Sequence, residues 1–202
     1  MENGFTRGRD DFEAVREGVS RVFHLKRRFP EMVFRKPSSR ILFCEYDAAM
    51  SPELWPAFQC LARLHGDDRI NLLVVEPDFQ SHYLEKHGVY PGISLSVESS
   101  EDEYWNIIGH EPESGLGGAI YISADVIAIT GTSGAWGCWG ERNDEILAVQ
   151  GISENISDEA WRDKFGPFFG ASEALEKYVS PAFHWNVKEW YSSSLISNYE
   201  CR

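Results

Sequence analysis

The sequence predicts a mixed α+β fold: a mainly antiparallel sheet with a βαβ-like unit near the N-terminus and flanking helices at both ends. Three observations lead to this prediction. Apolar residues recur at helical spacing near the N-terminus, short apolar segments alternate with turn residues through the middle, and capped helical segments return near the C-terminus. Apolar residues make up 43% and charged residues 25% of the chain, which is a globular composition and excludes a disordered chain.

The chain of 202 residues shows no internal repeat, low-complexity segment or linker. We therefore expect one domain over residues 1–202, in which residues 1–39 form a helix and a loop that pack on the rest. A chain of this length buries about 70% of the surface that its unfolded state exposes, so it needs no metal ion or disulfide to fold.

The first expected element is a helix over residues 11–28. Asp10 and Asp11 precede Glu13 in the pattern of a helix cap, and Pro30 forbids a helical continuation. One face of this helix is apolar, and its residues are Phe12, Val15, Val19, Val22 and Phe29.

Buried strands are expected over residues 40–46 and 69–76, because both segments are mostly apolar. Between them, Ser51-Pro52 opens a helix that Gly66 ends. Strand, helix and strand together span about 35 residues, which is the length of a βαβ unit. We therefore expect the two strands to be parallel.

The middle of the chain continues with a short helix and a series of strands. Residues 79–87 form the helix, which Gly88 closes, and residues 93–97 alternate as a half-exposed strand. Residues 117–151 then have the pattern of an antiparallel meander. Its four expected strands are residues 119–122, 126–130, 135–140 and 145–149.

Helices return towards the C-terminus. Ser157 caps a helix that ends at Gly166, and a short helix over residues 172–179 stops at Pro181. The last segment, residues 183–199, is aromatic and polar without clear periodicity, so no element is predicted there.

The net charge of −13 is unevenly distributed. Residues 1–40 hold ten basic and six acidic residues and carry +4, whereas residues 41–202 hold nine basic and 26 acidic residues and carry −17. The basic segment either docks on the acidic body or serves as an arm that reaches a membrane or a nucleic acid. The acidic body excludes nucleic acid as the main partner, because it repels phosphates.

No motif predicts a cofactor, a metal site or a catalytic residue. The cysteines form no C-x-x-C pair, and the histidines include no H-E-x-x-H spacing. Nothing in the sequence selects a cysteine–histidine pair such as Cys44 with His65 or Cys138 with His110. Residues 131–134, Gly-Thr-Ser-Gly, follow an apolar strand as a phosphate-binding loop does, but no helix is expected after them, which favours a hairpin turn.

The sequence also indicates a compartment. Its start lacks an apolar leader, and no segment approaches the roughly 18 apolar residues of a membrane span. Cys44 and Cys60 lie in apolar stretches, which predicts buried free thiols. We expect a cytoplasmic protein without membrane contact.

The densest acidic cluster lies beside two aromatic residues. Its residues are Glu98, Glu101, Asp102 and Glu103, followed by Tyr104 and Trp105. This segment is either a solvated loop or helix start, or an anionic patch that docks a basic protein. Carboxylates accelerate the encounter with such a partner, and Trp and Tyr supply desolvated anchor area.

A second aromatic string, residues 136–142, contains two tryptophans and Glu141. On a strand, Trp136 and Trp139 face opposite sides of the sheet. One then packs in the core, and the other is covered by a helix or exposed to a partner. Trp139 and Glu141 therefore join the candidate partner-binding residues.

Three functions are consistent with these observations. The first is a small acidic binding protein, in its most specific form a bacterial immunity-type inhibitor that neutralises a basic toxin such as a nuclease. The second is an enzyme with carboxylates at adjacent strand ends near Asp47 and Asp78, where they would bind a divalent metal or act as acid and base. The third is a structural subunit of an assembly.

Overall fold

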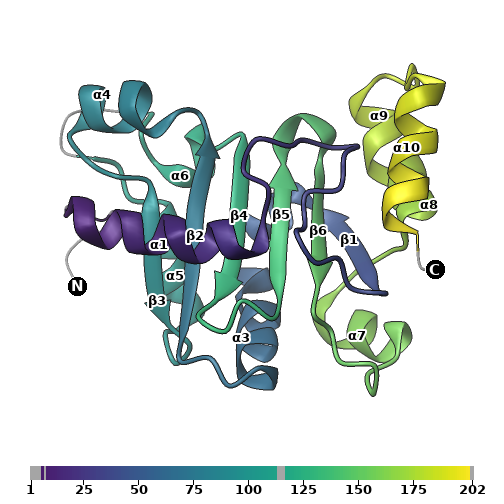
Figure 1. The fold of residues 1–202 in the computed structure, drawn as a ribbon, viewed down its shortest axis with the longest axis horizontal. Helices are drawn as coiled ribbons and strands as arrows, with labels where there is room; N and C mark the ends of the chain where they lie inside the picture. Colours follow the sequence, from purple (N-terminus) through teal and green to yellow (C-terminus); the bar gives the residue numbers. More distant parts are fainter. Residues whose placement is uncertain (1–5, 7, 113–116, 201–202) are drawn as a thin grey trace.

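The computed structural model describes residues 6, 8–112 and 117–200 and confirms the predicted mixed α+β fold. An antiparallel six-stranded sheet runs through the molecule in the order β1-β6-β5-β4-β2-β3, and helices cover both of its faces (Figure 1). The strands are β1 (Ile41–Glu45), β2 (Arg69–Glu76), β3 (Gly92–Ser96), β4 (Val126–Gly131), β5 (Gly137–Glu141) and β6 (Ile146–Gln150).

One face of the sheet carries the first and the last helices of the chain (Figure 1). They are α1 (Arg9–Val22), α8 (Ala171–Ala174), η4 (Leu175–Val179), α9 (Ser180–Ala182) and α10 (Glu189–Tyr199). Residues 23–40, here called the connecting segment, lie on the same face. These elements bury a core that includes Phe23, Phe43 and Trp139.

The other face carries the helices from the middle of the chain. They are α2 (Tyr46–Ala49), η1 (Pro52–Leu54), α3 (Trp55–Leu64), α5 (Glu101–Ile108), α6 (Ile120–Ser123) and α7 (Asp158–Phe165). Their core includes Trp55, Tyr104 and Trp136. Three short elements follow strand ends, namely η2 (Phe79–Leu84) and α4 (Glu85–His87) after β2 and η3 (Arg142–Asp144) after β5.

The two tryptophans of the meander lie on opposite faces of the sheet, as predicted. Trp136 packs in the core on the face that carries α3, and Trp139 packs on the other face beneath the connecting segment, with the Phe23 ring 5.4 Å away and the Arg28 guanidinium over its ring. Both side chains are fully buried, so β5 is covered on both faces. A strand that is buried on both faces explains why β4, β5 and β6 are almost uninterrupted apolar runs.

The expected strand–helix–strand unit is present as β1, α3 and β2, but its strands are not neighbours. Each successive pair from β1 through β6, β5 and β4 to β2 is antiparallel, so β1 and β2 point the same way with three strands between them. Length and order in the sequence define such a unit locally, whereas strand pairing depends on contacts between distant segments.

Residues 120–123 form helix α6, which corrects the prediction of a strand over residues 119–122. The backbone N–H groups of Ser123 and Ala124 donate to the carbonyls of Ala119 and Ile120, both at 2.9 Å. The Ser123 hydroxyl also donates to the Ala119 carbonyl, at 2.8 Å. A short apolar run cannot by its pattern distinguish a buried strand from a buried helical turn, and here the local hydrogen bonds decide.

The first helix ends at Val22, six residues earlier than the predicted end. Phe23 is extended and pairs with Phe34, and the N–H of His24 donates to the carbonyl of Val33 at 2.8 Å. Phe29 therefore enters the core from the connecting segment, and its helical spacing from Val22 is coincidental.

The C-terminal region is more helical than the sequence predicts. Helical structure continues through η4 and α9, because Pro181 lies in the first turn of α9, where its missing N–H is not needed. The unpredicted helix α10 buries Tyr191, Leu195 and Tyr199 at a spacing of four residues. Its exposed Trp190 obscures this pattern in the sequence.

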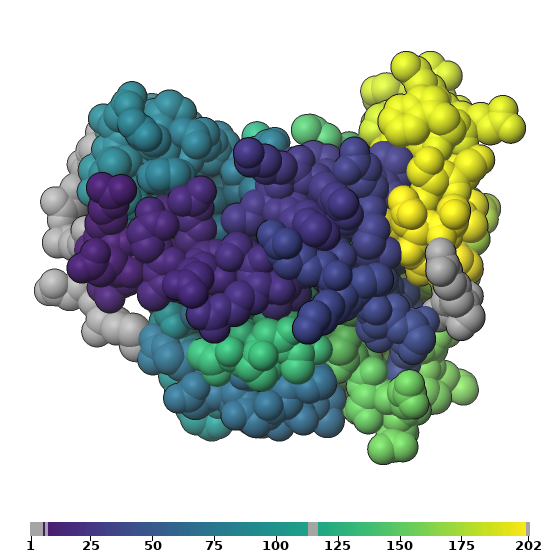
Figure 2. All heavy atoms as spheres, viewed as in Figure 1, coloured from purple at the N-terminus to yellow at the C-terminus, as the bar shows by residue number. Residues whose placement is uncertain are grey.

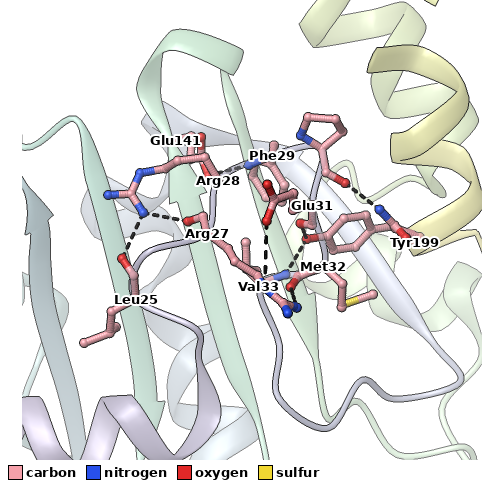
Figure 3. A network of polar contacts seen from close by, with 11 residues as sticks. Leu25, Arg27, Arg28, Phe29, Glu31, Met32, Val33, Glu141 and Tyr199 are labelled. Carbon is pink, nitrogen blue, oxygen red and sulfur yellow. Dashed lines mark hydrogen bonds and ion pairs between the residues drawn. The ribbon is translucent and has the colours of Figure 1, made fainter. Parts of the chain in front are cut away.

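The connecting segment is held on the sheet by polar contacts to distant residues (Figure 3). The N–H of Phe29 donates to Glu141 Oε1 at 2.8 Å, and the N–H of Val33 donates to the Tyr199 hydroxyl at 2.9 Å. Two ion pairs, Arg28–Glu76 and Arg40–Asp158, also join this segment to the acidic part of the chain. Within the described ranges, no helix has the length and apolar character needed to cross a membrane.

Candidate functional site

One edge of the sheet collects the ends of β1, β2 and β5 together with the residues that follow them. We call it the strand-end edge, and it lies at the upper end of the molecule in Figure 1. Besides Asp78, which caps η2, its exposed carboxylates are Glu45, Asp47, Glu76, Asp125 and Glu145. In Figure 2 this edge is hollowed between η2 and α4 on one side and the α9–α10 region on the other.

Backbone hydrogen bonds fix the order of these carboxylates. The N–H of Asp125 donates to the carbonyl of Glu76 at 2.9 Å, and the N–H of Arg142 donates to the carbonyl of Asp125 at 2.8 Å. Further along, the N–H of Tyr46 donates to the carbonyl of Glu145 at 3.1 Å. Acidic residues that lie far apart in the sequence therefore occupy neighbouring positions.

Two arginines lie among these carboxylates, too few to balance the charge of all five. Arg28 pairs with Glu76, and Arg142 Nη1 lies 3.7 Å from Asp47 Oδ1. The position of Arg142 is fixed by the backbone, because its guanidinium donates to the carbonyls of Ala124 and Tyr121 at 2.9 and 2.7 Å. With five exposed carboxylates and two arginines, the edge carries a net charge of −3. The Asp47 side chain remains 73% exposed.

A cavity of about 420 Å³ opens beside the carboxylates on the side of α6, and its lining consists of Asp47, Met50, Tyr121, Ile122 and Arg142. The ring of Tyr121 packs against the ring of Trp105 on α5, with 5.3 Å between centroids. Trp105 is 37% exposed and Ile122 is 49% exposed. Tyr121 therefore joins two predicted regions into one surface, the α5 acidic cluster and the strand ends near Asp47.

The four acidic residues of the predicted cluster differ in the contacts that they make. Glu103 closes a capping box with Ser100 at the start of α5, and Glu98 pairs with Arg63. Glu101 and Asp102 are exposed in the first turn of α5. These two carboxylates and the side chain of Trp105 remain exposed to solvent.

Three predicted partner-binding residues, Tyr104, Trp139 and Glu141, are buried and are not accessible at the surface. The Tyr104 hydroxyl donates to the carbonyl of Ala49 at 2.6 Å. Trp139 Nε1 donates to Glu141 Oε1 at 2.8 Å, beneath the connecting segment. Core aromatics and interface aromatics share the same sequence pattern, and only the tertiary packing around each side chain distinguishes the two.

The strand-end edge rests on two buried acids. Burial and the charge of Asp144 raise the pKa of Glu141 to about 7, against the opposing effect of N–H donors from Trp139 and Phe29. Burial also raises the pKa of Asp144, whose carboxylate accepts a hydrogen bond from the Tyr191 hydroxyl. The second contact ties the β5–β6 turn to α10.

The other side of the edge presents aromatic residues that the sequence analysis did not single out. Phe183, Trp185 and Trp190 are 37%, 73% and 60% exposed. The centroid of the Tyr191 ring lies 5.6 Å from that of Phe183 and 5.8 Å from that of Trp190. The hydroxyl of the same Tyr191 donates to Asp144. No sequence pattern separates these exposed side chains from the buried Tyr191 and Tyr199 of the same segment.

Backbone strain gathers at this edge. Among the described residues, the non-glycine residues with positive φ are Glu145 at 55°, His184 at 51° and Trp185 at 61°. Left-handed backbone is unfavourable for residues that carry a Cβ, and such strain concentrates at functional sites. Here the strained residues include Glu145 in the β5–β6 turn and Trp185, the most exposed tryptophan, just before α10. The hydrogen bond between Asp144 and Tyr191 joins these two segments.

The predicted enzyme site is not assembled. Four strand spacings, roughly 19 Å, separate β1 from β2, so Asp47 and Asp78 do not follow adjacent strand ends. Asp78 caps η2, accepting hydrogen bonds from the N–H groups of Gln80 and Ser81, each at 3.1 Å. In the described part of the chain, no group of three or more His, Cys, Asp or Glu residues is placed to hold a metal ion.

The cysteines and the glycine-rich turn have structural roles. Cys44 and Cys138 are free and buried, and burial raises the pKa of both thiols, which opposes nucleophilic reactivity. Cys60 is only partly buried, and Cys201 lies outside the described residues. Residues 131–134 form the predicted β4–β5 hairpin turn, and the carboxylate of Asp67 accepts the hydrogen bonds that a bound phosphate would take.

The strand-end edge thus combines an acidic centre with exposed aromatic and apolar side chains on both sides. Comparison of the chain with protein-family models, curated proteins and solved structures found no match. Chemically, the edge suits a basic surface better than a small neutral ligand, since its carboxylates are spread along the sheet and open to solvent.

Proposed function

We propose that this protein binds a basic protein partner at the strand-end edge. In its most specific form, the proposal is an immunity-type inhibitor that neutralises a basic toxin such as a nuclease. The observation that carries it is the arrangement of the edge: a centre of net charge −3 between Tyr121 and Ile122 on one side and Trp185 and Trp190 on the other.

The carboxylates and the tryptophans of this surface contribute to binding in different ways. Exposed carboxylates attract a cationic partner over a distance and raise the association rate, while contributing little to affinity once they are screened. Exposed tryptophans supply the contact area that dominates affinity when a partner desolvates it. A nuclease toxin is cationic because it binds phosphates, so its own substrate surface matches the acidic centre.

The compartment is part of the same proposal. We place the protein in the cytoplasm, where thiols stay reduced. The buried free thiols of Cys44 and Cys138 support this placement.

The proposal is tested on the protein products of the genes adjacent to this one, each purified and titrated against the chain. We expect one basic product to bind, with an association rate that falls steeply between low salt and 150 mM salt. Double replacement Trp185→Ala and Trp190→Ala should weaken binding by about 2 kcal/mol or more. Charge reversal at Asp47→Lys and Asp125→Lys should lower the association rate at least tenfold at low salt.

A matched control reverses the same charge at the opposite end of the molecule, with Glu154→Lys and Asp163→Lys, both exposed. This control should change the association rate much less than the edge variant does. Equal effects of the two variants would remove the strand-end edge from the proposal. Failure of every adjacent basic product to bind, or to lose toxicity on co-expression with the chain, would contradict the proposed function.

A further inference from the structure

A cationic groove lies on the α1 face, apart from the strand-end carboxylates. It has a volume of about 490 Å³ and is bounded by α1, the connecting segment, the end of β2 and the start of η2. These segments meet on the face turned towards the viewer in Figure 2. The basic residues in its lining are Arg16, His24, Lys26, Arg27 and Arg35.

The charge of this groove is opposite to that of the chain as a whole. Asp78 is the acidic residue among the described lining residues, and its carboxylate is already engaged by the N–H groups at the start of η2. Arg16 and Arg27 have partners, Glu13 at 3.4 Å and Glu31 at 3.8 Å, in exposed pairs that water screens.

Lys26 and Arg35 form no ion pair with any described residue. Arg35 is held in place, because its Nε donates to the carbonyls of Ser20 and Phe23 at 2.6 and 3.1 Å. Burial, together with the charges of Arg27 and Arg35, lowers the pKa of His24, as expected where cations converge. A chain of net charge −13 thus keeps a concave site in which positive charge is not locally balanced.

The groove also has an apolar side. Phe12 and Phe79 line it with their rings 5.0 Å apart, and Leu73 contributes from β2. The guanidinium of Arg16 lies over the Phe79 ring, 5.6 Å from its centroid. A planar group that enters the groove would therefore stack on the guanidinium of Arg16, which itself lies over the Phe79 ring.

We propose that this groove binds a small organic anion that carries a multiply charged head and a planar apolar group, the chemistry of a nucleotide. The basic residues would hold the phosphate, and the Phe79 side would hold the base. The volume fits one small ligand rather than a polymer, since pockets for such ligands measure roughly 300–1,000 Å³. A polynucleotide would in addition meet the −17 charge of residues 41–202.

The test is isothermal titration calorimetry of the full chain with AMP and GMP, and with adenosine and inorganic phosphate as the two halves of the ligand. We expect a nucleotide to bind and each half to bind at least tenfold more weakly, because each half keeps only one set of contacts. Absence of nucleotide binding at millimolar concentration would overturn the proposal. Adenosine binding as tightly as AMP would do the same, and so would an oligonucleotide that binds more tightly per site than AMP.

Two variants test the residues named. Lys26→Gln and Arg16→Gln should each weaken nucleotide binding by about tenfold, which corresponds to one charge-assisted contact. Both side chains are exposed, so the fold should tolerate them, and thermal unfolding of each variant checks this. Lys177→Gln on η4, which lies outside the groove, is the control and should leave the dissociation constant unchanged. An equal loss in the control would assign the binding to general charge and overturn the proposal.

Discussion

The two ends of the sheet use carboxylates in opposite ways. At the end with the β4–β5 hairpin, Asp67 is buried and accepts hydrogen bonds from Thr132, Ser133 and the indole of Trp136. At the strand-end edge, the side chains of Asp125 and Glu145 make no hydrogen bond or ion pair with the described part of the chain. The same chemical group is structural where the chain supplies its donors and is available to a partner where it does not.

Glu141 is intermediate between these cases. It is buried like Asp67, but its donors are the indole of Trp139 and the N–H of Phe29, beside the second buried acid Asp144. The three carboxylate environments can therefore be separated by the stability of variants. The expected effects decrease from Asp67 through Glu141 to the exposed carboxylates.

Replacement Asp67→Ala should cause the largest loss. It removes the acceptor of the Ser133 N–H and of the Trp136 indole, and it leaves the buried indole N–H unsatisfied. We expect the free energy of unfolding to fall by about 3 kcal/mol or more, measured by urea denaturation. The neighbouring exposed Asp68→Ala should cost less than about 0.5 kcal/mol. Similar losses for the two variants would show that the carboxylate of Asp67 does not hold the hairpin.

Replacement Glu141→Gln should stabilise the protein in a pH-dependent manner. The native pKa of about 7 lies above the value of the unfolded chain, so the native state binds more protons between the two values, and stability falls as the pH rises through this range. Gln keeps the acceptor for Trp139 and Phe29 without the buried charge. The variant should match the wild type near pH 4 and exceed its free energy of unfolding at pH 8 by on the order of 3 kcal/mol.

The measurement compares urea denaturation of the two proteins at several pH values. Glu45→Gln, at an exposed position of the strand-end edge, serves as the control and should show no such divergence. A constant difference in the free energy of unfolding between Glu141→Gln and the wild type across the pH range would contradict the raised pKa of Glu141.

The exposed carboxylates should have the smallest effect on stability. Asp47→Asn and Asp125→Asn together should change the free energy of unfolding by less than about 1 kcal/mol, because Asp47 is 73% exposed and its pair with Arg142 is loose. Thermal and urea denaturation check this. A loss of several kcal/mol would place these carboxylates with Asp67 as structural groups and weaken the case for a docking surface.

Much of the local structure could be predicted from the sequence, since it depends on neighbours along the chain. Ser51 and Ser157 cap helices where predicted, and β2 has the predicted bounds. The predictions failed where distant contacts decide, as when α1 ends at Val22 so that the chain can pair with Phe34. The aromatic half of the proposed docking surface was missed for the same reason, because the exposure of Trp185 depends on how α9 and α10 pack.

The sequence by itself determined the fold class, the caps at Ser51 and Ser157, the last three strands of the meander and the opposite faces of Trp136 and Trp139, whereas the predicted Asp cap of the first helix was wrong because α1 begins after Gly8. These properties follow from side-chain periodicity and from hydrogen bonds that span a few residues. The tertiary structure alone decided that three strands separate β1 from β2 and that Asp47, Asp125 and Glu145 share one edge. Strand order and burial depend on contacts between segments that are far apart in the chain, and no local pattern encodes them.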